Sequence, residues 1–162
     1  MVDLNAHLPD EAATLALGAA IAVNLEPGLT FYLRGDLGAG KTTLVRGMLR
    51  ALGHAGPVKS PTYTLVELYE VSRLVLHHFD FYRFHDPREW IDAGFRESFD
   101  DRSVSLIEWP EKAEGSVPPA DLEITLRASG SGRSASFMHN SVRGQKCLVR
   151  LAGHFPISSP DS

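Results

Sequence analysis

Cysteine is nearly absent from this sequence of 162 residues. The only one is Cys147, so no disulfide can form within the chain. A chain without disulfides fits a reducing compartment, since bridges persist mainly in oxidising ones, and it would equally fit a secreted protein without bridges. Of the two, we expect a cytoplasmic protein.

Long apolar runs and positive charge near the first residue are also missing. No stretch approaches the length of a membrane span, and Met1 to Pro9 contains Asp3 but no Lys or Arg, unlike the charged start of a secretory signal. Repeats, low-complexity tracts and linkers are absent as well. With 43% hydrophobic and 22% charged residues, the chain is expected to form a single domain over residues 1–152, followed by a flexible tail over residues 153–162.

Basic residues are outnumbered by acidic ones. There are 16 Lys and Arg against 20 Asp and Glu, which gives a formal net charge of -4. Non-specific attraction to a nucleic-acid backbone normally requires a basic face. Any RNA contact is therefore expected to be indirect, through a partner.

The sequence does contain one strong motif, from Gly35 to Thr42. It matches the P-loop pattern of Gly, four residues, Gly, Lys and Ser or Thr. A β-favouring run, Leu29 to Leu33, precedes it, and a helical pattern, Lys41 to Leu52, follows it. Glycines let the backbone amides point inward to form an anion site, Lys41 can reach the β- and γ-phosphates, and the Thr42 hydroxyl can ligate Mg²⁺. A glycine-rich turn with an exposed lysine is the plain alternative, and the flanking elements argue against it.

A P-loop site also needs a carboxylate at a strand end, and two candidates compete. Glu108 ends the apolar run that begins at Ser103, while Asp80 follows the run from Leu74 to Phe79. We favour Glu108 for the metal, because central parallel strands present their carboxyl ends to the ligand. Asp80 is kept as a supporting or water-positioning carboxylate. Either residue alone could be a solvated acid at a strand end.

Four of the histidines and the cysteine are assigned no role in metal binding or catalysis. His77 and His78 are neighbours on a predicted strand and face opposite sides, so they cannot bind one metal ion together. His54 and His85 are assigned to loops, and Cys147 to packing within a β-like run.

The pattern along the chain predicts an α/β P-loop NTPase-like domain. Its mixed sheet would have mainly parallel core strands flanked by helices, with antiparallel strands toward the C-terminus. The expected helices are Asp10–Leu25, Lys41–Leu52 and Pro87–Ala93. The expected strands are Leu29–Leu33, Tyr63–Val71, Leu74–Phe79, Ser103–Trp109 and Leu122–Leu126. Further β-like sequence follows the Gly130–Gly132 turn and reaches Leu151.

Four segments of the chain form a recognisable set: Gly35–Thr43, Lys59–Val66, His78–Arg83 and Leu106–Glu111. Together they resemble the TsaE family of bacterial tRNA threonylcarbamoyladenosine biosynthesis proteins, which are P-loop ATPases. The order and spacing of the four make the resemblance far more specific than the P-loop alone, and it extends from about Pro9 to Leu151.

The resemblance implies a Mg-dependent ATPase with ATP and Mg²⁺ as cofactors. It would support formation of the threonylcarbamoyl group on adenosine-37 of tRNAs that read ANN codons, acting with the TsaB and TsaD proteins, of which TsaD performs the transfer. A physical argument adds that phosphoryl transfer needs a positive group at the developing charge, which a partner often supplies, so we expect weak ATPase activity alone and stronger activity in the assembly. Arg83 and Arg96 are the candidate cations within this chain.

The same resemblance assigns roles to residues. Thr42 and Glu108 would hold Mg²⁺, and residues Lys59 to Thr64 would form a switch-like loop. The remaining implied roles are catalysis by Lys41, Asp80, Glu108 and Trp109, phosphate binding by Leu37, Gly38, Ala39, Gly40, Lys41, Thr42 and Thr43, and further nucleotide contacts by Glu11, Thr14 and Arg133.

Two other functions remain open. A small-molecule kinase has a suitable size, but Arg127 and Arg133 flank a Gly-Ser turn and do not form an arginine-rich lid. A non-catalytic adaptor would use ATP binding alone to stabilise a docking surface. A GTPase is disfavoured because the chain has no Asn-Lys-x-Asp segment.

Overall fold

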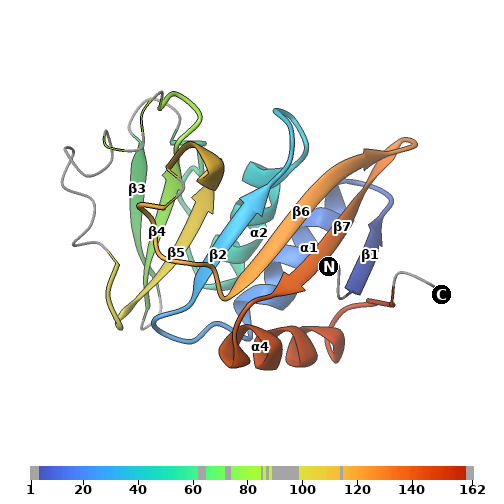
Figure 1. Ribbon diagram of the computed structural model, residues 1–162. Coiled ribbons are helices and arrows are strands. Elements are labelled where there is room, and N and C mark those ends of the chain that lie inside the picture. Colours follow the sequence, from blue (N-terminus) through green and yellow to red (C-terminus); the bar gives the residue numbers. More distant parts are fainter. Residues whose placement is uncertain are drawn as a thin grey trace.

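The computed structural model describes residues 4–61, 65–71, 74–84, 86, 88, 99–113 and 115–159. Within these residues, one seven-stranded sheet has the strand order β1-β7-β6-β2-β5-β4-β3, and helices flank it (Figure 1). The elements are β1 Leu4–Leu8, α1 Glu11–Ala22, β2 Thr30–Arg34, α2 Lys41–Ala51, β3 Val66–Val71, β4 Leu74–Asp80, β5 Ser103–Glu108, the 3₁₀ helix η2 Pro110–Ala113, β6 Leu122–Ser129, β7 Gly132–His139 and α4 Val142–Ala152.

The centre of the sheet is parallel. β2 pairs with β5 on one side and β6 on the other, and β4 pairs with β5, all in parallel. Antiparallel pairs lie outside this centre, where β3 pairs with β4, β6 with β7, and β7 with β1. Every residue of β5 is buried, as a strand with both faces covered requires. The predicted mixed α/β sheet is confirmed.

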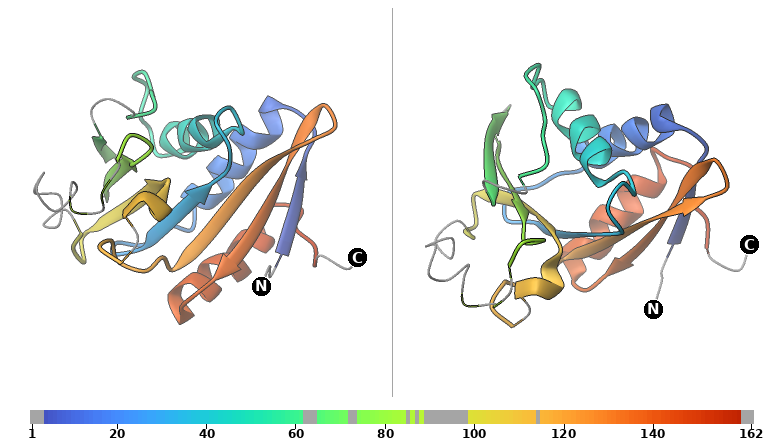
Figure 2. Two further views of the ribbon diagram at one scale, coloured as in Figure 1. Left: turned by 45° about the horizontal axis from the view of Figure 1, so that its top comes forward. Right: turned by 90° about the horizontal axis from the view of Figure 1, so that it is seen from above.

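Helices α1 and α2 cover one face of the sheet (Figure 2), and α4 packs against the same hydrophobic core, which contains Leu17 of α1 and Leu122 of β6. The first two helices approach closely through glycine. A Cβ on Gly47 of α2 would lie 2.3 Å from the carbonyl oxygen of Leu15 in α1, so no larger residue fits there without displacement. This contact holds α2, and with it the end of the P-loop, against the body of the domain.

The expectation of β-structure up to Leu151 is wrong, because residues 142–152 form helix α4. The Ser141 side chain accepts a hydrogen bond from the Gly144 amide (3.0 Å) and so caps the helix. The buried positions of α4 then follow a helical spacing, with one face on the core, at Gly144, Cys147, Leu148 and Leu151.

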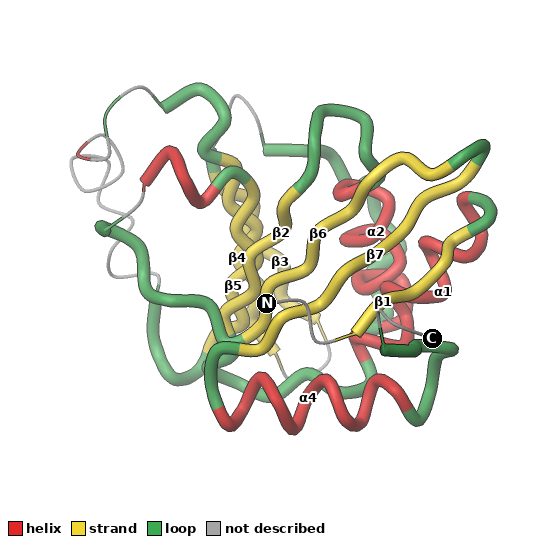
Figure 3. The backbone as a smooth tube through the Cα atoms, turned by 45° about the vertical axis from the view of Figure 1, so that its right-hand side comes forward, coloured by secondary structure: helices red, strands yellow, loops and turns green. Residues whose placement is uncertain are grey.

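Both terminal segments add to the sheet. β1 was not expected from the sequence, and it pairs antiparallel with β7. In the described part of the expected tail, Ser158 exchanges two backbone hydrogen bonds with Asn5, and Phe155 and Ile157 pack against the main core. Figure 3 shows the C-terminal segment passing beside β1.

Element boundaries agree with the predictions to within a few residues, apart from α4. Helix α1 begins after Asp10, whose side chain accepts from the Ala13 amide (2.8 Å). The predicted helix over residues 87–93 lies outside the described residues, except for Arg88. No helix in the described ranges is long and apolar enough to cross a membrane.

Candidate nucleotide-binding site

The P-loop connects the end of β2 to the start of α2. Gly38 and Gly40 have φ angles of 77° and 106°, which side-chain-bearing residues rarely adopt. Gly40 is the N-cap of α2 and has no side chain to bond the first amides of that helix. The first amides of a helix have no partner within the helix, so the start of this 11-residue helix fits the predicted anion site.

Lys41 lies at the first position of α2 and is 5% exposed. Its Nζ donates to the carbonyl oxygen of Gly35 (2.6 Å) and lies 3.7 Å from Oε1 of Glu108. The same ammonium group is 4.2 Å from the centre of the Trp109 ring, a cation–π contact. The structure therefore brings together three of the four predicted catalytic residues.

Glu108 ends β5 and is 2% exposed. Its Oε2 lies 2.6 Å from Nε2 of His78, a fully buried residue of the neighbouring strand β4. The backbone turns sharply after Glu108, because Trp109 has a φ of 57°. This uncommon conformation places the indole over Lys41 and 5.0 Å from the Tyr82 ring.

Asp80 pairs with Glu108 across the two strands, so the competing carboxylates lie side by side at one edge. Asp80 accepts hydrogen bonds from the Ser60 hydroxyl (2.8 Å) and the Tyr82 amide (2.9 Å). Ser60 belongs to the predicted switch-like loop, of which residues 62–64 lie outside the described residues. The contact ties the described part of that loop to the site.

One cavity of about 330 Å³ joins these groups. It is lined by Lys41, Thr42, Asp80, Glu108 and Trp109, together with the P-loop residues Leu37, Gly38, Gly40 and Thr43 and with Ser60 and Arg133.

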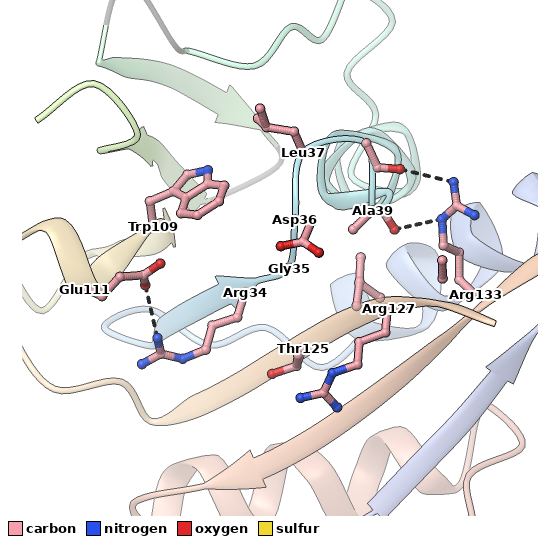
Figure 4. A pocket seen from close by; sticks show the side chains of 13 residues that line it. Arg34, Gly35, Asp36, Leu37, Ala39, Trp109, Glu111, Thr125, Arg127 and Arg133 are labelled. Carbon is pink, nitrogen blue, oxygen red and sulfur yellow. Dashed lines mark hydrogen bonds and ion pairs between the residues drawn. The ribbon is translucent and has the colours of Figure 1, made fainter.

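The three further residues predicted to contact the nucleotide also lie close together. Glu11, Thr14 and Arg133 line a cleft of about 170 Å³ that reaches Gly40 and Thr43. Arg133 of β7 bonds the P-loop itself, since its guanidinium donates to the carbonyl oxygens of Ala39 (3.0 Å) and Gly38 (3.1 Å), as Figure 4 shows beside Ala39. Arg133 thus supports the loop from β7, which β6 separates from β2 in the sheet.

Comparison with known proteins identifies the family. The family described as threonylcarbamoyl adenosine biosynthesis protein TsaE matches residues 8–135. The chain belongs to the TsaE family. It is 41% identical to the tRNA threonylcarbamoyladenosine biosynthesis protein TsaE of Haemophilus influenzae, over 91% of this chain and 97% of that one. It is 37% identical to the protein of the same name from Bacillus subtilis, over 93% of this chain and 94% of that one.

A solved structure supports the same conclusion for this TsaE-family chain. The crystal structure of Bacillus subtilis YdiB superposes with a TM-score of 0.81 at 30% identity, covering 95% of this chain and 97% of that chain. The α/β fold with its mixed sheet is therefore the fold of that protein.

Sequence reasoning missed His78 as a member of the site. From the sequence, His78 was considered only as a possible metal ligand together with His77. The contact with Glu108 depends on the register of β4 against β5, in which His78 pairs with Leu106. The signal available in the sequence was a histidine within the apolar run Leu74–Phe79, two residues before Asp80.

A larger cleft of about 710 Å³ lies on the other side of the P-loop (Figure 4). Arg34 stands there at the end of β2 and forms ion pairs with Glu111 (3.1 Å) and Glu123 (2.8 Å). This cleft and the 330 Å³ cavity share four lining residues: Leu37, Gly38, Trp109 and Arg133.

Proposed function

We propose that this TsaE-family chain is a Mg-dependent ATPase required for the threonylcarbamoyl modification of adenosine-37 in tRNAs reading ANN codons, acting with TsaB and TsaD. The observation that carries the proposal is the single cavity in which Lys41, Thr42, Asp80 and Glu108 meet. The names of the relatives supply the pathway.

The donor set of the cavity fits magnesium. The Thr42 hydroxyl and the Glu108 carboxylate are hard oxygen donors in one cavity, and no thiol lines it. Mg²⁺ is commonly bound by one or two carboxylates plus substrate phosphates, so it does not need a cage made only of protein ligands. When bound, it neutralises charge on the β- and γ-phosphate oxygens.

Several groups of the protein bind the phosphates and position the attacking water. The P-loop amides bind phosphate oxygens, and Lys41 places its positive charge where negative charge increases during phosphoryl transfer. Asp80, held by Ser60 and the Tyr82 amide, orients the attacking water. Trp109 covers Lys41 and limits water around its ammonium group.

Dependence on partners follows from the cations at the site. Among the described residues, the cationic side chains that line the cavity are Lys41 and Arg133. The Arg133 guanidinium already donates hydrogen bonds to two P-loop carbonyl oxygens. A further positive group supplied in trans would raise the rate, as in other P-loop enzymes. We therefore propose weak hydrolysis by the isolated chain and faster hydrolysis in the assembly, with tRNA contact indirect.

The decisive measurement is phosphate release from ATP, with and without TsaB and TsaD. We expect release into water without an added small acceptor, which a kinase would require, and a higher turnover in the assembly. Equal turnover alone and assembled would refute the dependence on partners.

Glu108→Ala separates hydrolysis from an adaptor role. We expect the variant to retain ATP binding through the P-loop while kcat falls at least about 100-fold, since a preorganised charged group is lost from the reacting centre. Full tRNA modification by this variant without hydrolysis would favour the adaptor.

A further inference from the structure

A buried histidine holds one oxygen of the candidate metal carboxylate. His78 is 0% exposed and Glu108 is 2% exposed, and the two lie on adjacent parallel strands. Nε2 of His78 is 2.6 Å from Oε2 of Glu108. His78, Asp80 and Glu108 project to the same face of the sheet, because alternate residues of a strand share a face and Asp80 pairs with Glu108.

The surroundings of the imidazole show where its proton lies. Nδ1 of His78 is buried and has no hydrogen-bond partner among the described residues. A proton on Nδ1 would be left unsatisfied in the interior, whereas a proton on Nε2 meets the carboxylate. The geometry therefore makes Nε2–H the donor and Oε2 of Glu108 the acceptor.

The two oxygens of Glu108 consequently have different roles. Oε2 is occupied by His78, while Oε1 lies 3.7 Å from Lys41 Nζ, and Glu108 lines the phosphate cavity. A carboxylate without its histidine would be free to rotate about its last side-chain bonds. Hydrogen-bond partners of this kind orient metal ligands in many proteins.

We propose that His78 is a positioning residue, which fixes the Glu108 carboxylate so that Oε1 is presented to the Mg²⁺ of bound Mg-ATP. The proposal rests on the proposed function and deepens it. A role in stability alone does not explain this pair. Burying an imidazole and a carboxylate carries a desolvation penalty, whereas apolar side chains could join β4 to β5 without that penalty.

Two amide substitutions of His78 test the direction of the hydrogen bond. The amide nitrogen of Gln occupies nearly the place of Nε2, and that of Asn nearly the place of Nδ1. His78→Gln is therefore expected to keep the hydrogen bond to Glu108, and His78→Asn to lose it. With partners present, we expect kcat of His78→Asn to fall about 10–100-fold and that of His78→Gln to stay within a few-fold of the original.

The second readout is ATP binding, which does not require turnover. For His78→Asn, the Kd for ATP without Mg²⁺ should stay unchanged, while the strengthening of ATP binding by Mg²⁺ falls about 10–100-fold. His77→Gln is the matched control, because His77 is also buried in β4 but projects to the opposite face. It should leave both quantities unchanged.

The proposal is overturned if His78→Asn keeps the original kcat and Mg²⁺ response, or if His78→Gln is impaired as strongly as His78→Asn. Thermal unfolding of each variant shows whether it is folded. If neither folds, ¹⁵N NMR of the unsubstituted protein decides. A proton on Nε2 that shifts in Glu108→Gln supports the proposal, and a proton on Nδ1 refutes it.

Failure of the proposed function is distinguishable from failure of this inference. If the unsubstituted protein released no phosphate with its partners, hydrolysis would be refuted. The Mg²⁺ dependence of ATP binding and the NMR signal would still report on His78.

Discussion

The thiol of Cys147 packs against the core from α4, and it is 3% exposed. Burial raises the pKa of this thiol to about 11. At pH 8 only about a thousandth of it is then thiolate, the reactive form. We expect a thiol reagent to label the native protein at least about 100-fold more slowly than the protein unfolded in guanidinium. Equal rates would show that Cys147 is accessible.

His77 makes stability depend on pH. Burial lowers its pKa below the ordinary value of 6.5, and attraction to Asp100 offsets part of that effect. As pH falls below about 6.5, the unfolded chain binds a proton at His77 that the folded chain resists, so the free energy of unfolding decreases.

The expected result is a smaller loss of stability for His77→Gln than for the original protein between pH 7.5 and pH 5.5. Urea unfolding at the two values measures it. Equal losses would exclude His77 as a source of the pH dependence.

Residues with local sequence signals were predictable, and those defined by strand pairing were not. The P-loop residues were predictable from their sequence motif. Asp80 and Glu108 were predictable because each stands at the end of an apolar run. His78 was missed because its partner is 30 residues away and the contact requires the register of two parallel strands. The roles of these residues stay predictions until they are measured.

At the scale of elements, the contact between α1 and α2 can be tested by one methyl group. In Gly47→Ala, the new Cβ would lie 2.3 Å from the Leu15 carbonyl oxygen, so the helices must separate. Alanine gains about 1 kcal/mol of helix propensity, but overpacking typically costs about 1–3 kcal/mol.

We therefore expect Gly47→Ala to lower the free energy of unfolding measured in urea, although alanine has the higher helix propensity. Gln145→Ala on the exposed side of α4 is the control and should change stability by less than about 0.5 kcal/mol. A more stable Gly47→Ala would contradict the close packing.

The error at α4 has a physical origin. Residues 142–151 contain Val, Cys and Leu, which read as a strand when they are taken one by one. Their buried positions instead follow intervals of three and four, and Ser141 supplies the cap. β1 was missed because a five-residue strand at a chain end has too short a pattern to stand out.

At the scale of the whole molecule, the two chain ends stabilise one another. Removal of residues 153–162 would eliminate both hydrogen bonds between Ser158 and Asn5, and the packing of Phe155 and Ile157 on the core. We expect a loss of about 2–4 kcal/mol in the free energy of unfolding. A chain ending at Ser159 keeps these contacts and is the control. An unchanged stability of the shorter chain would support the flexible tail expected from the sequence.

The position of β2 also determines when the site can exist during synthesis. Leu33, just before the P-loop, pairs with Glu108 on one side and Ile124 on the other. A ribosome completes the P-loop well before it makes either neighbour, at roughly 5–20 residues per second. The nascent chain therefore carries an intact P-loop motif that has no folded sheet beneath it. We expect nucleotide binding to require this folded sheet, so ATP would stabilise the protein only after β6 has emerged and would not guide the early steps of folding.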